Sequence, residues 1–232
     1  MAVPSPRTSA KRRYILCSVL LFSLAVTCID AFVHPPYFSK IPIKIVFFLA
    51  LPMLYFIFWR EERNACRELF RFRKSGLFIS CLIGCGIYAV IVGGYLLTRN
   101  IFDFSGVTGS LGEGMGITAD NFLYVAVYIS VMNSFLEEFF FRGFGFLTLK
   151  KFVPTAAAYL ISPLLFAVYH VGMIVDMFQP AVLALILFGL VSGGVIFNAL
   201  NHRFGNLYPS WLAHMAANFA INTVGFLLFD MI

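Results

Sequence analysis

Long apolar runs, separated by short polar segments, make up most of the chain. Each run holds roughly 20 residues, which is the length of an α-helix that crosses about 30 Å of hydrocarbon. Helices are expected because a bilayer offers the backbone no water, so each span must pair its own N–H and C=O groups. About seven spans can be drawn, with expected bounds at 14–33, 41–59, 76–97, 121–147, 154–175, 180–201 and 207–230.

The composition agrees with this pattern. Of the 232 residues, 60% are hydrophobic and only 12% are charged, and the mean hydropathy is +0.88. A water-soluble domain of this length needs more polar surface. We therefore expect an all-α fold, a polytopic transmembrane helical bundle that forms a single membrane domain over 1–232 and encloses an intramembrane cavity.

The net charge of +6 does not indicate a nucleic-acid partner, because of where the charges lie. Lys and Arg sit between the apolar runs, and such residues are enriched in the cytoplasmic connections of membrane proteins. With a cytoplasmic N-terminus, every Lys and Arg falls on the cytoplasmic side except Lys40, Lys44 and Arg99. The sequence thus predicts a multi-pass protein in a lipid bilayer, with the N-terminus cytoplasmic and the C-terminus on the opposite side.

The connections and the small residues show no separate site. The segment 105–116, SGVTGSLGEGMG, lacks the Lys and Ser/Thr of a phosphate-binding loop, so a flexible surface loop is expected. Gly189 and Gly193 form a GxxxG pattern, which is typical of close helix packing within a bundle or between copies. The five Cys residues include no CxxC pair and are expected to be buried apolar residues.

Ionisable groups inside a bilayer cost several kcal/mol unless they are paired, so each one requires a reason. The fourth span carries Glu137, Glu138 and Arg142. Glu138 and Arg142 are four residues apart and share a helical face, which favours an ion pair. Glu137 points about 100° away and lacks a partner on its own helix, so its carboxylate is available as a general base or acid.

The fifth and seventh spans add Phe166, His170, His214 and Asn218. A buried neutral imidazole can orient water or bind a metal, and an Asn amide can donate to a developing oxyanion. Each residue alone also has a structural explanation, since a buried His is often hydrogen-bonded within a core and a Glu–Arg pair often only joins helices. Their combination in three spans favours a site that hydrolyses an amide with activated water.

Other polar residues are expected to lie outside this site. Asn198 and Asn201 could line a cavity near the end of the sixth span. The remaining expectations are loop positions for His34 and His202, an interfacial position for Asp30 and a short outer loop for Asp176.

Three patterns follow one another along the chain: Glu137-Glu138-x-x-x-Arg142, Phe166-x-x-x-His170 and His214-x-x-x-Asn218. In residue type, spacing and order they resemble the signature motifs of the CPBP intramembrane proteases. That family includes the Ras-converting CAAX endopeptidases and the bacteriocin-processing (ABI) proteins. The resemblance covers 137–218 and implies a CPBP-like catalytic core at 121–230, preceded by N-terminal transmembrane helices at 1–120.

The resemblance also implies an activity: endoproteolysis of a membrane-anchored protein or peptide, including C-terminal or lipidated substrates. By this similarity, Glu137 and His170 activate water and His214 and Asn218 steady the oxyanion, with Glu138, Arg142 and Phe166 in supporting roles. Glu137, His170 and His214 could ligate a divalent metal such as zinc, but the chain has no HExxH motif, so spacing does not decide the matter. We favour a metal-free glutamate mechanism, with no other cofactor implied.

A non-enzymatic membrane protein is the alternative: a proton-coupled carrier or a bacteriocin-immunity protein that binds its partner without cutting it. Glu137 and the histidines could form a proton relay in such a protein. Carriers of this kind often show paired repeats or broken helices at matching positions, and the sequence shows neither.

The depth of the motif residues raises a geometric requirement. Straight parallel helices would place Glu137, His170 and His214 at different heights in the bilayer. Kinks near Pro163 or Pro209, or tilted helices, are therefore expected. Because Glu137 lies in the inner half of its span, the cavity is expected to open towards the cytoplasm.

Overall fold

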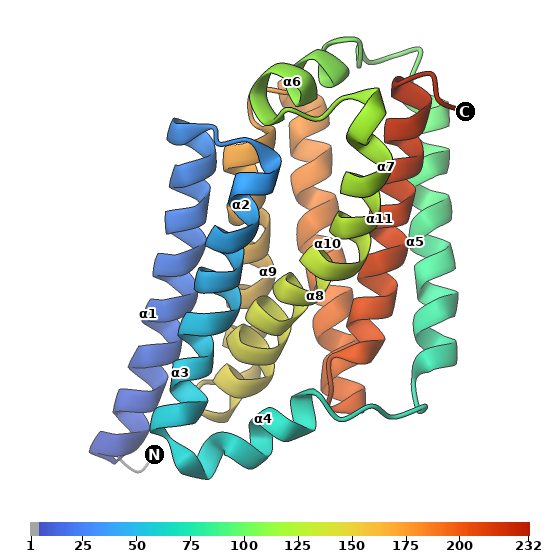
Figure 1. The fold of residues 1–232 in the computed structure, drawn as a ribbon. Coiled ribbons are helices and arrows are strands. Elements are labelled where there is room, and N and C mark those ends of the chain that lie inside the picture. The colour runs from blue at the N-terminus through green and yellow to red at the C-terminus, as the bar shows by residue number, and fades with distance from the viewer. Residues whose placement is uncertain (1–4) are drawn as a thin grey trace.

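The computed structural model describes residues 5–232 and contains only helices and their connections in that range. Seven helices are long and apolar enough to cross a membrane, and they stand side by side in one bundle (Figure 1). Every expected span is present, which confirms the prediction of an all-α, polytopic bundle. The spans are Pro6–Val33, Tyr37–Phe58, Leu77–Thr98, Ala119–Lys151, Thr155–Ile174, Pro180–Phe204 and Tyr208–Leu228.

The first two spans are each built from successive helical segments. Ser5 begins the first span, because its hydroxyl accepts a hydrogen bond from the Thr8 N–H at 3.2 Å. Pro42 lies inside the second span and removes one backbone donor just before a π-helical stretch. The segments are α1 (Pro6–Cys28) and π-helical η1 (Ile29–Val33), then α2 (Tyr37–Lys44), π-helical η2 (Ile45–Ala50) and α3 (Leu51–Phe58).

After α3 the chain crosses one end of the bundle as a 3₁₀ turn, η3 (Arg60–Glu62), and α4 (Arg63–Leu69), before α5 (Leu77–Thr98) (Figure 1). The Glu62 carboxylate accepts hydrogen bonds from Lys11 at 2.8 Å and from Lys151 at 2.9 Å. Burial acts to raise the pKa of Glu62, but these two bonds outweigh it and hold the pKa below its usual value. One carboxylate thus joins the connection to the ends of the first and fourth spans.

The Gly-rich segment at the opposite end is a helix, so the prediction of a loop there is wrong. Helix α6 (Gly106–Met115) ends at Gly116, whose φ is +67°. The Gly116 N–H bonds back to the Gly112 carbonyl oxygen at 3.0 Å, in the left-handed cap that glycine favours. Val107 and Met115 are buried, and they form an apolar helical face that the glycine content concealed.

The fourth span is the least regular, and it slants across the bundle between its two ends (Figure 1). Every residue of its long π-helical part, η5, is buried. π-Helical turns are uncommon and often mark functional sites. The segments are α7 (Ala119–Tyr128), π-helical η4 (Ile129–Asn133), α8 (Ser134–Glu137), η5 (Glu138–Thr148) and the 3₁₀ turn η6 (Leu149–Lys151).

Three further helices complete the bundle: α9 (Thr155–Ile174), α10 (Pro180–Phe204) and α11 (Tyr208–Leu228). Helix α9 packs against α1, α10 and η5, while α11 packs against α5 and α10. The ring of Phe48 stacks on that of Phe140 with 4.4 Å between centroids. An aromatic core therefore surrounds the slanted span, and its fully buried members from that span are Phe139, Phe140, Phe141, Phe144 and Phe146.

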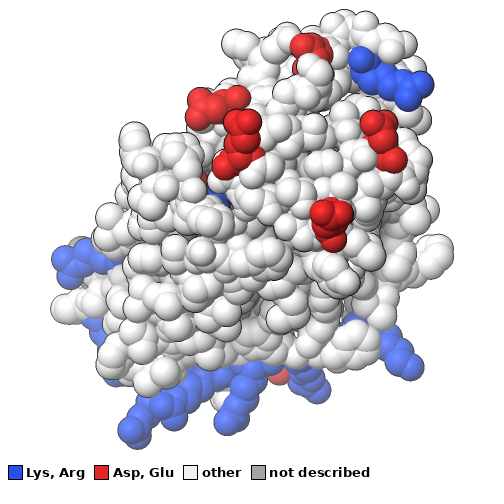
Figure 2. Space-filling view, turned by 45° about the horizontal axis from the view of Figure 1, so that its top comes forward, with Lys and Arg blue, Asp and Glu red and all other residues white. Residues whose placement is uncertain are grey.

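Charged residues divide between the two ends of the bundle. On the face in Figure 2, Lys and Arg gather at the end that carries the N-terminus, and most Asp and Glu gather towards the α6 end. The membrane orientation remains a prediction from this asymmetry. Lys11, Lys40, Lys44 and Arg142, whose charges served to assign the two sides of the membrane, are all buried. Lys40 pairs with Asp30 at 2.8 Å, and both side chains are buried.

Small residues also differ from expectation. A Cβ atom at Gly189 or Gly193 would meet nothing within 4 Å, so the GxxxG pattern does not pack inside the bundle. The adjoining Gly194 does pack inside the bundle, since a Cβ atom added there would lie 2.8 Å from the Pro163 Cβ. Cys66 is buried, but the other Cys residues are exposed, which corrects the expectation that all five are buried.

Gly172 allows the closest approach between α1 and α9. A Cβ atom there would lie 2.4 Å from the Thr27 carbonyl oxygen, a distance that real contacts do not reach. We expect Gly172→Ala to force the two helices apart and to lower the free energy of unfolding by about 1–3 kcal/mol. The matched change Gly193→Ala, in open space, should lower it by no more than about 0.5 kcal/mol. Thermal unfolding in detergent measures both, and equal losses would contradict the assigned close contact.

Candidate active site

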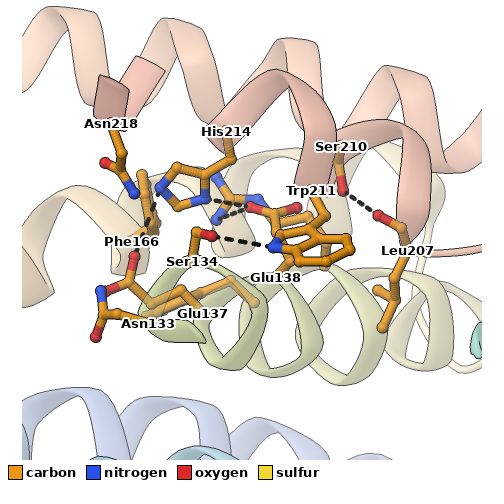
Figure 3. Close-up of polar contacts among 12 residues, drawn as sticks. Asn133, Ser134, Glu137, Glu138, Phe166, Leu207, Ser210, Trp211, His214 and Asn218 are labelled. Carbon is orange, nitrogen blue, oxygen red and sulfur yellow. Dashed lines mark hydrogen bonds and ion pairs between the residues drawn. The ribbon is translucent and has the colours of Figure 1, made fainter. Parts of the chain in front are cut away.

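Side chains from all three motifs, among them Glu137, Phe166 and His214, lie together where α11 packs against the fourth span (Figure 3). Glu137 ends α8, Glu138 begins η5, and His214 reaches both carboxylates from α11. The His214 Nε2 lies 3.7 Å from Glu137 Oε2, and its Nδ1 lies 2.9 Å from Glu138 Oε1. The tilt of the fourth span therefore removes the mismatch in depth that straight helices would impose.

The expected ion pair between Glu138 and Arg142 is present at 3.2 Å, with both side chains fully buried. Glu138 Oε1 is also the oxygen that contacts His214 Nδ1. A carboxylate can only accept, so we assign the ring proton of neutral His214 to Nδ1 from its partner. Its Nε2 is then left unprotonated and faces Glu137.

Glu137 has more partners than the sequence suggested. Its Oε1 accepts hydrogen bonds from the Asn133 amide at 2.6 Å and from the Tyr169 hydroxyl at 3.0 Å. The Lys44 ammonium lies 3.7 Å from the same oxygen and donates to Asn133 Oδ1 at 2.8 Å. Asn133 stands one turn earlier on the same span, so the prediction that Glu137 lacks a partner there is wrong. One carboxylate oxygen is held, and the other faces His214.

Sequence reasoning missed three residues of this arrangement: Lys44, Asn133 and Tyr169. A signal existed for Lys44, because a lone charge within an apolar run such as IPIKIVFFLA requires a partner. Lys44 was placed within the second span, but its charge was used only to assign the sides of the membrane. Asn133 carried a weaker signal, since it lies four residues before Glu137 and shares its helical face. Tyr169 carried none beyond its position next to His170.

His170 is half-buried on α9, and its Nδ1 lies 2.7 Å from the Phe166 carbonyl oxygen. Because a carbonyl only accepts, this contact assigns the ring proton to Nδ1 and leaves Nε2 free to accept. Within residues 5–232 no hydrogen bond or ion pair joins His170 to Glu137, and the His170 ring packs against those of Phe166 and Tyr169. The structure thus brings His170 to the edge of the Glu137–His214 pair.

Phe166 separates and packs the charged groups. The Arg142 guanidinium lies 3.9 Å from the centroid of its ring, a cation–π contact. The imidazoles of His170 and His214 meet the same ring edge-on, with centroids at 4.7 and 5.6 Å. The orientation of three polar side chains therefore depends on one aromatic ring.

Asn218, one turn beyond His214, is 8% exposed. Its amide nitrogen donates to the Ile129 carbonyl oxygen at 3.2 Å. A side-chain amide carries two N–H groups, so the second stays available to a bound group. Figure 3 shows Asn218 on the same side of α11 as His214.

The side chains do not fit a metal site as they stand. Across residues 5–232, no group of three or more His, Cys, Asp and Glu side chains is placed to hold a metal ion. Glu137 and His214 are close enough to share one, but a catalytic zinc takes three protein ligands. The set that the sequence left open, with His170 as the third ligand, is therefore not assembled.

The comparisons with known proteins address the whole arrangement. A family model described as "Rce1-like: Type II CAAX prenyl endopeptidase Rce1-like" matches residues 119–220, a range that contains all three motifs. This segment, which is less than half of the chain, is thus similar to the Rce1-like family. A search of the curated proteins and a search of the solved structures each found no match.

The Rce1-like segment begins with α7 and ends within α11, so the first three spans lie outside it. Its match confirms the resemblance to the CPBP and CAAX proteases that the motifs indicated. Together with seven apolar helices, it supports a multi-pass membrane protein with CAAX-type endopeptidase activity on membrane-associated substrates. Lys44 lies outside the Rce1-like segment and nevertheless contacts its Glu137.

In the described part of the chain, His202, Asn198 and Asn201 make no hydrogen bond to a motif side chain. His202 belongs to α10, not to a loop as expected, and contacts the Tyr159 hydroxyl at 3.2 Å. Asn198 is fully buried and accepts from Ser162 Oγ at 3.3 Å, and Asn201 is buried beside it on α10. At the α6 end, a pocket of about 330 Å³ has walls that include Asp30, His34, Lys40, Glu113 and Asp176.

The Glu138–Arg142 pair should behave as a unit. Arg142→Met leaves the Glu138 charge buried without its cation, so we expect it to lower the free energy of unfolding by about 3–5 kcal/mol. Adding Glu138→Gln removes that orphaned charge and should recover part of the loss. Denaturant unfolding of the two single variants and the double variant measures the coupling. Strictly additive losses would show that the pair contributes nothing as a pair.

Proposed function

We propose that this chain is an intramembrane endopeptidase of the CAAX type that hydrolyses a peptide bond in a membrane-anchored protein or peptide. The observation that carries the proposal is the set of contacts that the two oxygens of Glu137 make. One of its oxygens is fixed by Asn133 and Tyr169, and the other faces His214 Nε2 at 3.7 Å. Residues 121–230 form the catalytic core of a single membrane domain, and 1–120 supply the helices that surround it.

In this mechanism Glu137 is the general base. Its Oε2 takes a proton from a water molecule while the water oxygen bonds to the scissile carbonyl carbon. The carbonyl electron pair moves onto oxygen and creates a tetrahedral oxyanion. The C–N bond then breaks, and the leaving nitrogen takes the proton that Glu137 carries. The products are a new carboxyl terminus and a free amine, so one water is consumed for each bond cut.

His170 and the α11 residues act around this exchange. The free Nε2 of His170 accepts a hydrogen bond from the water and orients it. The unused N–H of Asn218 donates to the oxyanion. His214 donates to it only when Nε2 also carries a proton, while its Nδ1 is held by the Glu138 carboxylate. Glu138, Arg142 and Phe166 hold His214 in place.

Substitution of the base gives the first test. We expect Glu137→Gln to lower cleavage by at least about 100-fold, since Gln cannot take the proton of the water. Membrane peptidomes of host cells that carry the wild type or the variant at equal expression measure this. A small set of membrane proteins should keep uncut termini only with Glu137→Gln, and that set names the substrates.

Glu113→Gln is the matched control, because Glu113 is an exposed carboxylate on α6. It should give the wild-type peptidome. Gel filtration of each detergent-solubilised variant checks that it folds. If Glu137→Gln folds and its peptidome equals the wild type, hydrolysis is refuted, and proton-coupled transport or immunity-type binding takes its place.

The glutamate mechanism makes a second prediction. Without a catalytic metal, a chelator such as EDTA or phenanthroline should leave cleavage of an identified substrate within about twofold of the untreated rate. This follows from the lack of a third ligand beside Glu137 and His214 in residues 5–232. Loss of activity on chelation, with recovery on added zinc, would instead assign Glu137, His170 and His214 as ligands.

A further inference from the structure

Lys44 is the charge whose position the proposed mechanism leaves unexplained. It is the last residue of α2 and is 5% exposed, inside an apolar span. Its ammonium lies 2.8 Å from Asn133 Oδ1, 3.7 Å from Glu137 Oε1 and 5.3 Å from the centroid of the Tyr169 ring. These contacts all belong to the immediate surroundings of one carboxylate.

A role in joining α1 to α2 does not account for Lys44. Lys40, one turn earlier on α2 and equally buried, already makes that connection through its 2.8 Å pair with Asp30. Lys44 reaches in the other direction, across to the fourth span. Lys40 therefore forms a structural ion pair, whereas Lys44 contacts the site.

Lys44 also fixes how the Asn133 amide is turned. A lysine ammonium can only donate, so it must face the carbonyl oxygen of that amide. The NH₂ group is thereby directed at Glu137, to which it donates at 2.6 Å. If the amide were reversed, Asn133 Oδ1 would face Glu137 Oε1, and both of these oxygens are acceptors. Lys44 thus orients Glu137 through Asn133 as well as by its charge.

The charges near Glu137 leave Lys44 as the cation committed to it. Arg142 pairs with Glu138, and the two histidines are charged only when they take a second proton. A buried carboxylate without a cation becomes protonated, and a protonated carboxyl group cannot accept the proton of a water molecule. Among residues 5–232, the titratable groups near enough to interact electrostatically with Glu137 are Tyr37 and Lys44 from α2, Tyr128 from α7, Tyr169 and His170 from α9, His214 from α11, and Arg142 from its own span.

We propose that Lys44 is a positioning residue of the active site, supplied by the second span from outside the Rce1-like segment, that keeps Glu137 ionised and aimed for water activation. The inference rests on the proposed function. It adds a fourth helix to the site and makes the N-terminal spans necessary for activity.

The test compares Lys44→Met with Lys40→Met in the purified full chain, reconstituted in liposomes. The activity probe is a fluorescence-quenched peptide that ends in a farnesylated Cys-aliphatic-aliphatic-X sequence. For Lys44→Met we expect a loss of about 10–100-fold at neutral pH, with recovery as the pH rises, so that the acid limb of the rate profile moves up by about 1–2 pH units. Lys40→Met should keep the acid limb of its rate profile at the wild-type pH. A loss that is equal at every pH would make Lys44 merely structural and overturn the inference.

Infrared titration gives a readout that needs no substrate. The carboxylic-acid C=O band of Glu137 is the one that Glu137→Gln removes, and its appearance on acidification should begin at higher pH in Lys44→Met than in wild type. Identical titrations would refute the role of Lys44 even if the peptide is cleaved. If the wild type does not cleave the peptide or any host substrate, the proposed function fails while the infrared result still decides the role of Lys44.

Lys44→Arg covers the case in which Lys44→Met does not fold. It keeps the charge but changes the geometry of the donor. We expect a lower rate with the acid limb in its wild-type position. If the acid limb of Lys44→Arg instead moves up as far as predicted for Lys44→Met, the contribution of Lys44 is not its charge.

Discussion

Two buried carboxylates stand at adjacent positions of the fourth span, and a bundle of this polarity tolerates them only with compensating cations. Desolvation of a single unpaired charge costs several kcal/mol, so each carboxylate requires its own partner. Arg142, on the same span, compensates Glu138, and Lys44, from a different span, compensates Glu137. Because neighbouring residues of a helix point in different directions, the two cations reach their partners from different sides. The arrangement of α2, the fourth span and α11 follows from satisfying both.

This unequal supply of partners distinguishes the two carboxylates chemically. Glu138 holds Arg142 and His214 with a single oxygen and lies at the full depth of the core. Glu137 is restrained through one oxygen only, which leaves the other directed at a bare imidazole nitrogen. The Phe166 carbonyl accepts from His170 Nδ1, just as Glu138 accepts from His214 Nδ1. Both acceptors therefore select the tautomer that carries its proton on Nδ1. Acceptor-only groups thus leave an unprotonated nitrogen on each ring.

Much of this was predictable from the sequence, for reasons that differ by residue. The seven spans follow from hydrophobic length alone, and the Glu138–Arg142 pair follows from helical spacing within one span. Contacts between spans were harder, because spacing along a chain says nothing about which helices touch. Lys44 and Tyr169 belong to that class, as does the bond from His214 to Glu138. The α6 helix was missed because glycine is a poor helix former, and burial of one face outweighed that preference. The slant of the fourth span was foreseen only as a requirement.

The position of Lys44 also has a consequence for how the protein is made. A polytopic chain enters the membrane from its N-terminus, so Asp30 and Lys40 can neutralise each other as soon as the first two spans are in place. Lys44 cannot be neutralised at that stage, because Glu137 and Asn133 arrive two spans later. Until then the second span carries an unmatched ammonium, at a cost of about 2.5–3.5 kcal/mol for a central position. The finished site thus requires a charge that the second span carries before its partners arrive, and the fourth span supplies those partners.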